Sequence, residues 1–342
     1  MARRWARDLA PALVLAVVLA VIGVAVAVRS LDQDDSSAGP STSSSASPSA
    51  SASAGGSSSA TATAGAGGSS GSAGTSDGST GIDPSAIPSL SPCRSPRRLS
   101  VMTFNIHGGI GQHRVQLARI AAEIAAAQPD VVLLQEVDRF RFRTGFRDEP
   151  TILAGLTGMH AAFGTNVVRA PIGRETRQGL YGTAVLSRYK ILSSTNTHLP
   201  NRAGMEQRGL LRVRISLDGQ AVSVLDTHLQ QTSASMRVVQ IKAIRRLVAG
   251  IDEPVVLGGD FNSTPRSQVY RIAAGMLSDT WAQVGSGPGL THPQRRARNR
   301  IDFLFHNDWL TPTKARVLRS TVSDHRAVWA SYDVWGRAGC GN

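Results

Sequence analysis

The sequence predicts an α/β domain with two mixed β-sheets packed face to face and helices outside, preceded by a transmembrane helix and a disordered linker. Three observations predict this organisation. An uncharged apolar run occupies residues 9–28, and residues 30–92 are almost entirely Ser, Ala, Gly and Thr. Short apolar segments then alternate with two amphipathic helical patterns, which is typical of packed sheets covered by helices.

The apolar run Leu9–Val28 predicts a membrane anchor. It contains no charge, three arginines precede it, and Arg29 ends it. A helix needs roughly 20 apolar residues to cross the hydrocarbon core, and the basic flank should stay in the cytoplasm. We therefore expect residues 1–29 to anchor the chain in the cell membrane by a single pass, with the rest outside. The alternative is a cleaved signal peptide, because Ala25–Ala27 is a small-x-small site, and the chain would then be secreted.

Residues 30–92 predict a disordered linker. Their side chains are small or polar, so burial cannot offset the entropy of ordering this segment. A flexible chain of this length has a typical reach of about 45 Å. The linker would hold the following domain away from the membrane.

Residues 93–342 form the expected globular domain, and both cysteines of the chain lie at its ends. In an oxidising compartment, Cys93 and Cys340 would form one disulfide that joins the two ends. Two unrelated free thiols are the alternative. We expect the domain to be a monomer.

Hydrophobic patterns place the strands and helices of this domain. The Asp218-Gly219 pair predicts a hairpin turn, and Thr232 or Ser233 would cap a helix that Gly250 ends. The predicted strands are 99–105, 131–134, 183–186, 211–215, 221–225, 255–257, 301–305 and 327–332, and the predicted helices are 114–127 and 233–249.

Polar or acidic residues recur where these apolar strands end. They are Asn105, Glu136, the segment Asp226–His228 and the segment Asp260–Asn262. Each alone is typical of a turn, and a lone histidine is more often structural than catalytic. A rigid sheet can nevertheless present side chains at its strand ends to a cleft, so the ordered set predicts a site there.

This ordered set resembles the endonuclease/exonuclease/phosphatase superfamily over residues 99–332. The resemblance implies a four-layer α/β sandwich, and GDFN, RIDFLF and SDH in this order are highly specific. The motifs are MTFNIHGG with Asn105, LLQEV with Glu136, YGTAVLSR, QRGLL with Arg208, DTHL with His228, GGDFN with Asp260 and Asn262, RIDFLF with Asp302, and SDHRAV with Asp324 and His325.

The resemblance also implies a metal site. Glu136 would be the main ligand, with Asn105 close by and Asp324 as a further ligand. Hydrolysis of a phosphoester places charge on the phosphate oxygens, and Mg²⁺ neutralises such charge while preferring carboxylates and waters. We expect Mg²⁺, with Mn²⁺ as an alternative.

Catalytic roles follow from the same resemblance. Asp260 would orient or deprotonate the attacking water, and Asn262 would hold the phosphate. His325 would hydrogen-bond a non-bridging oxygen while Asp302 holds its ring, and His228 would protonate the leaving oxygen. Whether Asp260 or His325 is the general base stays open.

Arginines are the candidates for substrate binding. The chain has 37 basic and 24 acidic side chains, a formal net charge of +13, which favours polyanions or anionic surfaces. Arg208 resembles a family arginine near the phosphate, with a structural ion pair as the alternative. Two clusters, one holding Arg295 and Arg300, should lie at the mouth of the site or form a solvated face. Their members are Arg139, Arg141, Arg143 and Arg147, and Arg295, Arg296, Arg298 and Arg300.

Three further histidines need an interpretation. His107 and His292 could line the cleft. His198 follows the LSR stretch too soon to match the DTHL motif, so we expect no role for it in the site.

Three functions remain open. The first is a phosphodiesterase or phosphatase that acts on a lipid head group or another envelope phosphoester, which the predicted tether favours. The second is a membrane-tethered or secreted endonuclease, which the net charge favours, although no aromatic-rich stretch for stacking bases is present. The third is a catalytically inactive binding module, which the full set of motif residues disfavours.

Overall fold

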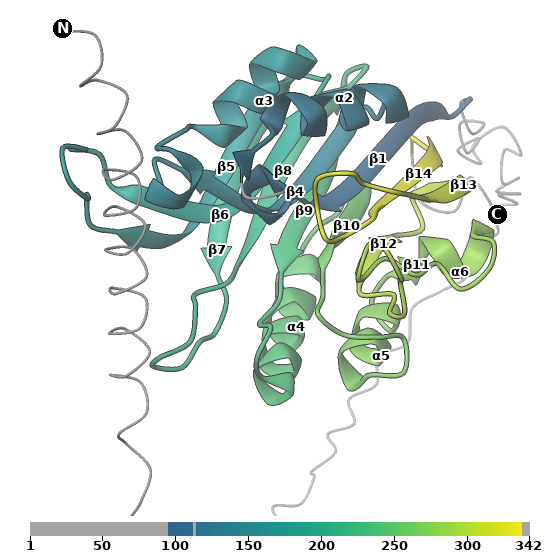
Figure 1. The fold of residues 1–342 in the computed structure, drawn as a ribbon. Helices are drawn as coiled ribbons and strands as arrows, with labels where there is room; N and C mark the ends of the chain where they lie inside the picture. The colour runs from purple at the N-terminus through teal and green to yellow at the C-terminus, as the bar shows by residue number, and fades with distance from the viewer. Residues whose placement is uncertain (1–94, 112–113, 337–342) are drawn as a thin grey trace, which may run out of the picture. The chain divides into compact units, whose positions relative to one another are not determined.

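The computed structural model describes residues 95–111 and 114–336 of the chain (Figure 1). The predicted anchor and linker, together with Cys93 and Cys340, lie outside the described residues. Among the helices of the described ranges, none is long and apolar enough to cross a membrane. The described residues form an α/β fold with two large mixed sheets, which confirms the predicted fold class.

The first sheet has six strands in the order β13-β14-β1-β4-β6-β5. Only the β1–β4 pair is parallel, so the carboxyl ends of these two strands lie at the same edge of the sheet. The strands are β1 (Arg97–Asn105), β4 (Val131–Arg139), β5 (His160–Arg169), β6 (Gly179–Ser187), β13 (Leu310–Leu318) and β14 (Ala327–Val334).

The second sheet has six strands in the order β11-β12-β10-β9-β8-β7. Here β9 and β10 are the parallel pair. The strands are β7 (Ile191–His198), β8 (Gly209–Leu217), β9 (Gln220–His228), β10 (Val255–Asp260), β11 (Ser278–Asp279) and β12 (Asp302–His306). Two short strands, β2 (Ile110–Gly111) and β3 (Arg114–Val115), form a separate pair.

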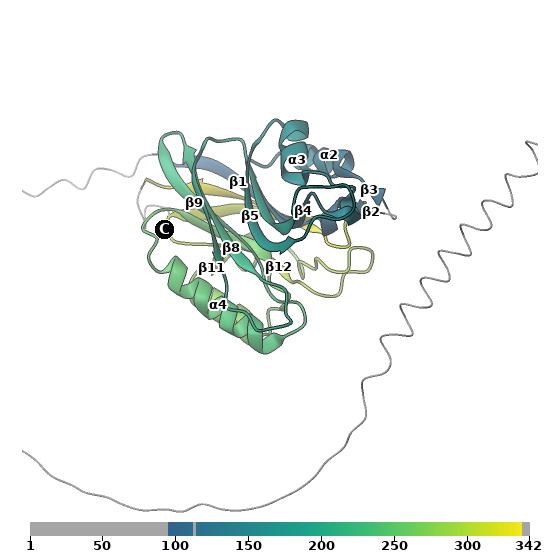
Figure 2. The same ribbon diagram turned by 90° about the vertical axis from the view of Figure 1, so that its left-hand side faces the viewer.

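Helices cover the outer faces of both sheets. In Figure 2, α2 and α3 lie on one side of the sheets and α4 on the other. Buried side chains join α2 and α3 to the first sheet, and another cluster joins α4 and α5 to the second. The helices are α2 (Leu117–Ala127), α3 (Glu149–Thr157), α4 (Ala234–Val248), α5 (Gln268–Ala274) and α6 (Thr280–Val284), with the 3-10 turns η2 (His107–Gly109) and η3 (Phe142–Thr144).

Burial on both faces explains why β1 is apolar along its length. Leu99 and Val101 face the second sheet, while Met102 and Phe104 face the helices, and all four are at most 1% exposed. Successive strand residues point to opposite faces, so a strand buried on both faces needs apolar residues at both parities. β4 follows the same rule.

The structure confirms the predicted hairpin and one helix cap. Asp218 and Gly219 join β8 to β9 with φ angles of 49° and 87°, as a two-residue hairpin loop requires. The Ser233 side chain accepts a hydrogen bond from the backbone N–H of Met236 at the start of α4.

Several predicted boundaries were wrong. The helix predicted from residue 114 begins at Leu117, because Arg114 and Val115 pair with β2 instead. The strand predicted to end before Gln135 continues to Arg139. The patterns also missed α3 and α5, whose nine and seven residues are too few to show a clear helical period.

Candidate active site

Four strand ends from both sheets meet at one edge of the sandwich. β1 brings Asn105, β4 brings Glu136, and the parallel pair β9–β10 sets His228 beside Asp260 in register. The side-chain Nδ2 of Asn105 donates hydrogen bonds to Glu136 Oε1 (3.0 Å) and to Asp260 Oδ2 (3.1 Å). Asn105 therefore links the acidic groups of the two sheets.

Asp260 lies at the centre of this arrangement and is 1% exposed. Its Oδ1 accepts a hydrogen bond from the backbone N–H of Asn262 (2.8 Å), while Oδ2 lies 3.5 Å from His228 Nε2 and 3.7 Å from His325 Nε2. Burial, reinforced by the nearby carboxylate of Asp302, raises the pKa of Asp260 to about 7. This carboxyl can therefore accept or hold a proton near neutral pH.

Asp302 and His325 form a buried carboxylate–imidazole pair. His325 Nδ1 lies 3.1 Å and 3.0 Å from the two carboxylate oxygens of Asp302. Burial alone would lower the pKa of His325, but the charge and hydrogen bond of Asp302 outweigh it and raise the pKa to about 10. The ring is therefore a cation at neutral pH, with a second N–H at Nε2 facing Asp260.

His228 lies in the opposite electrostatic environment. Arg208 Nη1 donates to His228 Nδ1 at 2.8 Å, and the buried Arg208 is also paired with Glu206 at 3.2 Å. Burial and the charge of Arg208 hold the pKa of His228 well below its ordinary value. His228 is therefore a neutral imidazole, and because Arg208 occupies Nδ1, its proton sits on Nε2.

Strained backbone accompanies two of these residues. Glu136 (φ 57°) and Asn262 (φ 47°) adopt positive φ angles, which are uncommon for residues other than glycine. Glu136 lies where the β4–β6 register shifts between Leu134 and Val137, so a bulge turns its side chain toward the cleft. The side-chain Nδ2 of Asn262 donates a hydrogen bond to the carbonyl of Leu229 at 3.1 Å and lies 3.1 Å from His228 Nε2, so both nitrogens present N–H groups at this point.

Asp324 lies between two histidines at the exposed side of the site. Its Oδ1 is 3.5 Å from His107 Nδ1, and its Oδ2 is 3.8 Å from His292 Nε2. His107 also faces Glu136 Oε2 at 3.8 Å, and the ring of His292 lies 4.6 Å from that of His325. Both histidines that the sequence suggested as cleft-lining therefore flank the site.

The acidic groups offer a fitting place for a hard divalent cation. Two sets of ligand atoms lie within 4.8 Å of one another. Burial is the main cause of the raised pKa of Asp260, and the carboxylate of Asp302 adds to it, so a cation would compensate negative charge there. The sets are Asp260, Asp302 and His325, and His292, Asp324 and His325.

Asn105 faces the carboxylates of Glu136 and Asp260 with its amide nitrogen, which donates hydrogen bonds to both, and not with its amide oxygen. Its Oδ1 accepts a hydrogen bond from the backbone N–H of His107 at 3.1 Å, which fixes the orientation of the amide. Asn105 therefore bridges Glu136 and Asp260, while Glu136 and Asp324 keep carboxylate oxygens facing the cleft side.

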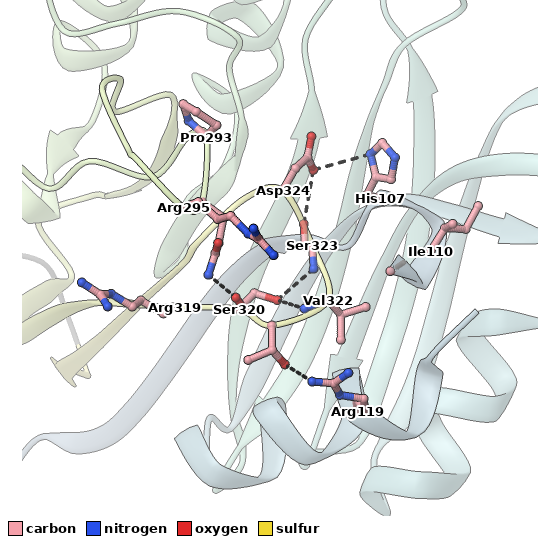
Figure 3. Close-up of a pocket in the computed structure, with 13 residues that line it drawn as sticks. His107, Ile110, Arg119, Pro293, Arg295, Arg319, Ser320, Val322, Ser323 and Asp324 are labelled. Carbon is pink, nitrogen blue, oxygen red and sulfur yellow. Dashed lines mark hydrogen bonds and ion pairs between the residues drawn. The ribbon is translucent and has the colours of Figure 1, made fainter. Parts of the chain in front are cut away.

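The predicted arginines occupy different environments. Arg295 lines a pocket of about 880 Å³ that also reaches His107 and Asp324 (Figure 3). Arg300 is 8% exposed and its guanidinium is paired with Asp279 at 2.6 Å, so that guanidinium serves a structural ion pair. In the other cluster, Arg139 pairs with Asp148 and Arg143 with Asp138.

Ser323 is a supporting residue that the sequence did not single out. Its hydroxyl donates to the backbone carbonyl of Asn105 at 2.6 Å and accepts from the backbone N–H of His325 at 3.0 Å. It therefore ties the loop that carries His325 to the end of β1. Its position next to Asp324 and His325 in the SDH triplet is the sequence feature that could have indicated this role.

Asp226 and His198 lie away from this cluster. Asp226 is fully buried between the sheets, where it accepts a hydrogen bond from Gln135 Nε2 at 2.7 Å. Burial raises its pKa well above the ordinary value. His198 ends the edge strand β7, and its Nε2 contacts the carbonyl of Thr165.

Known proteins are similar to this chain in sequence and in structure. Residues 102–325 match the family model described as the endonuclease/exonuclease/phosphatase family. Protein cwh43 of Schizosaccharomyces pombe is 28% identical over 216 residues, which are 60% of this chain and 19% of that protein. Nocturnin of Rattus norvegicus is 27% identical over 167 residues, 44% of this chain and 37% of that protein.

A solved structure agrees with these sequence relatives. An endonuclease/exonuclease/phosphatase from Beutenbergia cavernae is 27% identical, with a TM-score of 0.58 and coverage of 70% of this chain and 72% of that one. The chain spans well under half the length of the two curated relatives above.

Proposed function

Because the chain belongs to the endonuclease/exonuclease/phosphatase family, we propose that it is a Mg²⁺-dependent hydrolase of phosphoester bonds that acts outside the membrane. Members of this family are hydrolases of phosphoester bonds. The proposed substrate is a lipid head group or another phosphoester of the cell envelope.

One observation carries the proposal. Three nitrogen atoms surround a single carboxylate oxygen, Asp260 Oδ2, at the edge of the sandwich. They belong to Asn105 (3.1 Å), His228 (3.5 Å) and His325 (3.7 Å). A phosphate placed against this group would meet a proton acceptor and two imidazole N–H donors at once, which suits in-line attack by water.

Asp260 and His325 have complementary roles in this proposal. Asp260, with a pKa raised to about 7 by burial, orients the attacking water and takes its proton. His325 is kept protonated by Asp302, so its Nε2–H donates a hydrogen bond to a non-bridging phosphate oxygen. Since His325 stays charged, Asp260 is the better candidate for the general base.

His228 and Asn262 act on the other side of Asp260. Because His228 is neutral with its proton on Nε2, it donates a hydrogen bond to the phosphate or leaving oxygen without carrying a full charge. Asn262 lies 3.1 Å from the same nitrogen and would hold the phosphate beside it. A Mg²⁺ ion held by Glu136 with Asp324 would neutralise charge on the phosphate oxygens.

Location and domain organisation are part of the proposal. We assign residues 1–29 to a membrane anchor, 30–92 to a flexible linker and 93–342 to the catalytic domain, as the apolar run and the composition suggest. A Cys93–Cys340 disulfide is consistent with the register of β1 and β14, which pairs Arg97 with Val334. Only a few residues separate either cysteine from that pair.

An endonuclease is the second candidate function. It is favoured by arginines around the site that make no ion pair with a described residue, such as Arg295 and Arg298. Such groups would neutralise backbone phosphates of a nucleic acid regardless of its sequence.

A substrate panel tests the proposal. Full-length chain in detergent would be assayed with Mg²⁺ against phospholipids, phosphoinositides and plasmid DNA. We expect release of head groups or phosphate with DNA left intact. The variant His325→Gln should be inactive, whereas His306→Gln, a control at an equally buried histidine of β12, should retain activity. Nicking of DNA at low enzyme concentration would establish the nuclease instead, and no hydrolysis of any substrate would overturn the proposal.

A further inference from the structure

A basic pocket opens beside the proposed catalytic cluster. Its volume is about 880 Å³, and His107 and Asp324 belong both to its wall and to the cluster around Glu136. The pocket therefore adjoins the side of the cluster formed by His107 and Asp324. Figure 3 shows His107 and Asp324 at one end and Arg119 at the other.

The charge of the pocket is largely uncompensated. Three arginines line it, Arg119, Arg295 and Arg319, against one carboxylate, Asp324. Arg295 and Arg319 make no hydrogen bond or ion pair with another described residue. Arg119 donates only to neutral groups, Gln116 Oε1 (2.7 Å) and the hydroxyl of Thr321 (2.9 Å).

The acidic residue Glu123 of α2 makes no ion pair with these arginines. Its carboxylate accepts hydrogen bonds from the backbone N–H and the hydroxyl of Thr321. Other arginines of the described residues do pair with carboxylates, as Arg212 and Arg214 do with Glu253. Unpaired arginines gathered in one concave pocket are typical of an anion site.

Hydrogen bonds between two loops hold the pocket in shape. The backbone N–H of Gln294 donates to the carbonyl of Asp324, its side chain donates to the carbonyl of Ser320, and Arg326 Nε donates to the Gln294 carbonyl at 2.9 Å. Ser320 Oγ in turn accepts from the backbone N–H groups of Val322 and Ser323. Arg295 therefore projects from an anchored backbone, and Figure 3 shows its guanidinium directed toward Asp324 and Ser323, whereas Arg319 extends away at the rim.

The lining also limits the kind of ligand. Among the described residues of the lining, only Ile110, Pro293 and Val322 contribute apolar side chains, and none is a Phe, Tyr or Trp that could stack a nucleobase. An acyl chain or a base would therefore find little contact area, whereas a compact anion would meet guanidinium groups able to bind it with two parallel hydrogen bonds.

We propose that this pocket binds a second phosphate of the substrate, so that the enzyme acts on a polyol carrying two phosphate groups. One group would lie against Asp260 and His325, and the other would be held by Arg295 and Arg119. The inference rests on the proposed function and narrows its substrate class from any phosphoester to bisphosphorylated head groups.

Non-hydrolysable phosphonates test the second phosphate directly. Binding of alkane-α,ω-bisphosphonates with three to eight carbons would be compared with that of the matching monophosphonates. Calorimetry on the full-length chain in detergent with Mg²⁺ would report the affinities. We expect the best-fitting bisphosphonate to bind about tenfold more tightly than its monophosphonate, the usual scale of one charge-assisted bidentate contact.

Matched variants assign the gain to the pocket. Arg295→Gln should remove the tighter binding of the bisphosphonate over its monophosphonate, and Arg119→Gln should reduce this difference. Arg296→Gln, next to Arg295 but outside the pocket lining, should leave it unchanged. Equal binding of mono- and bisphosphonates to the native chain, or equal losses in Arg295→Gln and Arg296→Gln, would overturn the inference alone. Failure of every phosphonate to bind would overturn the proposed function with it.

A third arm separates the two sources of a second phosphate. A short single-stranded oligonucleotide would be added as a competitor of the best bisphosphonate. We expect weak competition that does not depend on Arg295. Strong competition that Arg295→Gln abolishes would assign the pocket to a neighbouring phosphate of nucleic acid and would overturn the polyol assignment.

Discussion

Arg208 donates a hydrogen bond to Nδ1 of His228 at 2.8 Å, and this contact determines which nitrogen of the imidazole carries the proton. A guanidinium is always protonated, so it can only donate. His228 must accept at Nδ1 and carry its proton on Nε2, the nitrogen that faces Asp260. An arginine that the sequence suggested as a phosphate ligand thus acts through a histidine.

Replacing Arg208 should impair turnover more than substrate binding. In Arg208→Leu the Nδ1 position loses its donor, so the imidazole can take the other tautomer and lose its Nε2–H toward the substrate. We expect kcat to fall by roughly 100-fold, the lower end of the usual contribution of one positioned proton donor, with little change in KM. Kinetics and nitrogen NMR of the His228 ring would check this. A rise in KM with unchanged kcat would instead indicate direct contact of Arg208 with the substrate.

Replacing Asp302 should change the pH dependence of activity. Asp302 raises the pKa of His325 to about 10, so the native ring stays protonated through neutral and mildly alkaline pH. In Asp302→Asn the largest charge that raises this pKa is lost, so only the charges of Asp260 and Asp324 still oppose burial, which acts downward. We therefore expect the activity of the variant relative to that of the native enzyme to fall as pH rises above about 6.5, measured as kcat/KM from pH 5 to 9. A parallel profile with uniformly lower activity would contradict this explanation.

Glu149 should make the fold less stable as pH rises. Burial raises the pKa of this carboxyl from 4.5 to about 8. Between these two values the unfolded chain loses its proton while the folded chain keeps it, so the contribution of Glu149 to stability falls with rising pH and levels off above about 8. Glu149→Gln keeps an acceptor for the backbone N–H of Asp138 and removes the ionisation.

The expected gain of Glu149→Gln over the native chain is on the order of 2–4 kcal/mol in the free energy of unfolding at pH 8.5, and near zero at pH 4. Urea unfolding at the two pH values would measure it. A gain of equal size at both would indicate improved packing in place of the titration.

Metal binding should stabilise the native chain through Glu136. Removal of divalent ions with EDTA should abolish hydrolysis, and Mg²⁺ should restore it. A ligand at 100 times its Kd adds about 2.7 kcal/mol to stability, so the melting temperature should rise with added Mg²⁺. Glu136→Gln should lose most of this rise, whereas Glu175→Gln, at a carboxylate already paired with Arg177, should retain it. An unchanged rise in Glu136→Gln would exclude Glu136 as a ligand.

Much of the candidate site could be predicted because parallel strands bring their carboxyl ends together. Asn105, Glu136, His228 and Asp260 are far apart in the sequence, yet each follows an apolar run, and the β1–β4 and β9–β10 pairs gather them. The periodicity that marks buried strands is a local property, so it could be seen without knowing the fold.

Other features depend on contacts that no local pattern encodes. The bulge that turns Glu136 depends on its register with β6, and the use of Arg208 depends on β8 lying beside β9. The basic pocket joins loops around Arg295 and Arg319 to Arg119 on α2. Arg295 and Arg300 were predicted as one cluster because they are close in the sequence. In the structure Arg295 lines the pocket, whereas Arg300 pairs with Asp279.

The antiparallel pairing of Arg97 with Val334 determines where a tag can be attached to the domain. β1 has nine residues and leads from Arg97 to Asn105, which lies at the cleft. Arg97 and Val334, near the two ends of the described fold, therefore lie about 26 Å from the cleft, at the opposite end of β1. A fluorescent protein or affinity tag fused at either end would leave the cleft open. Under the proposed membrane attachment, a flexible linker joined at this end would let the cleft face away from the membrane or back toward it.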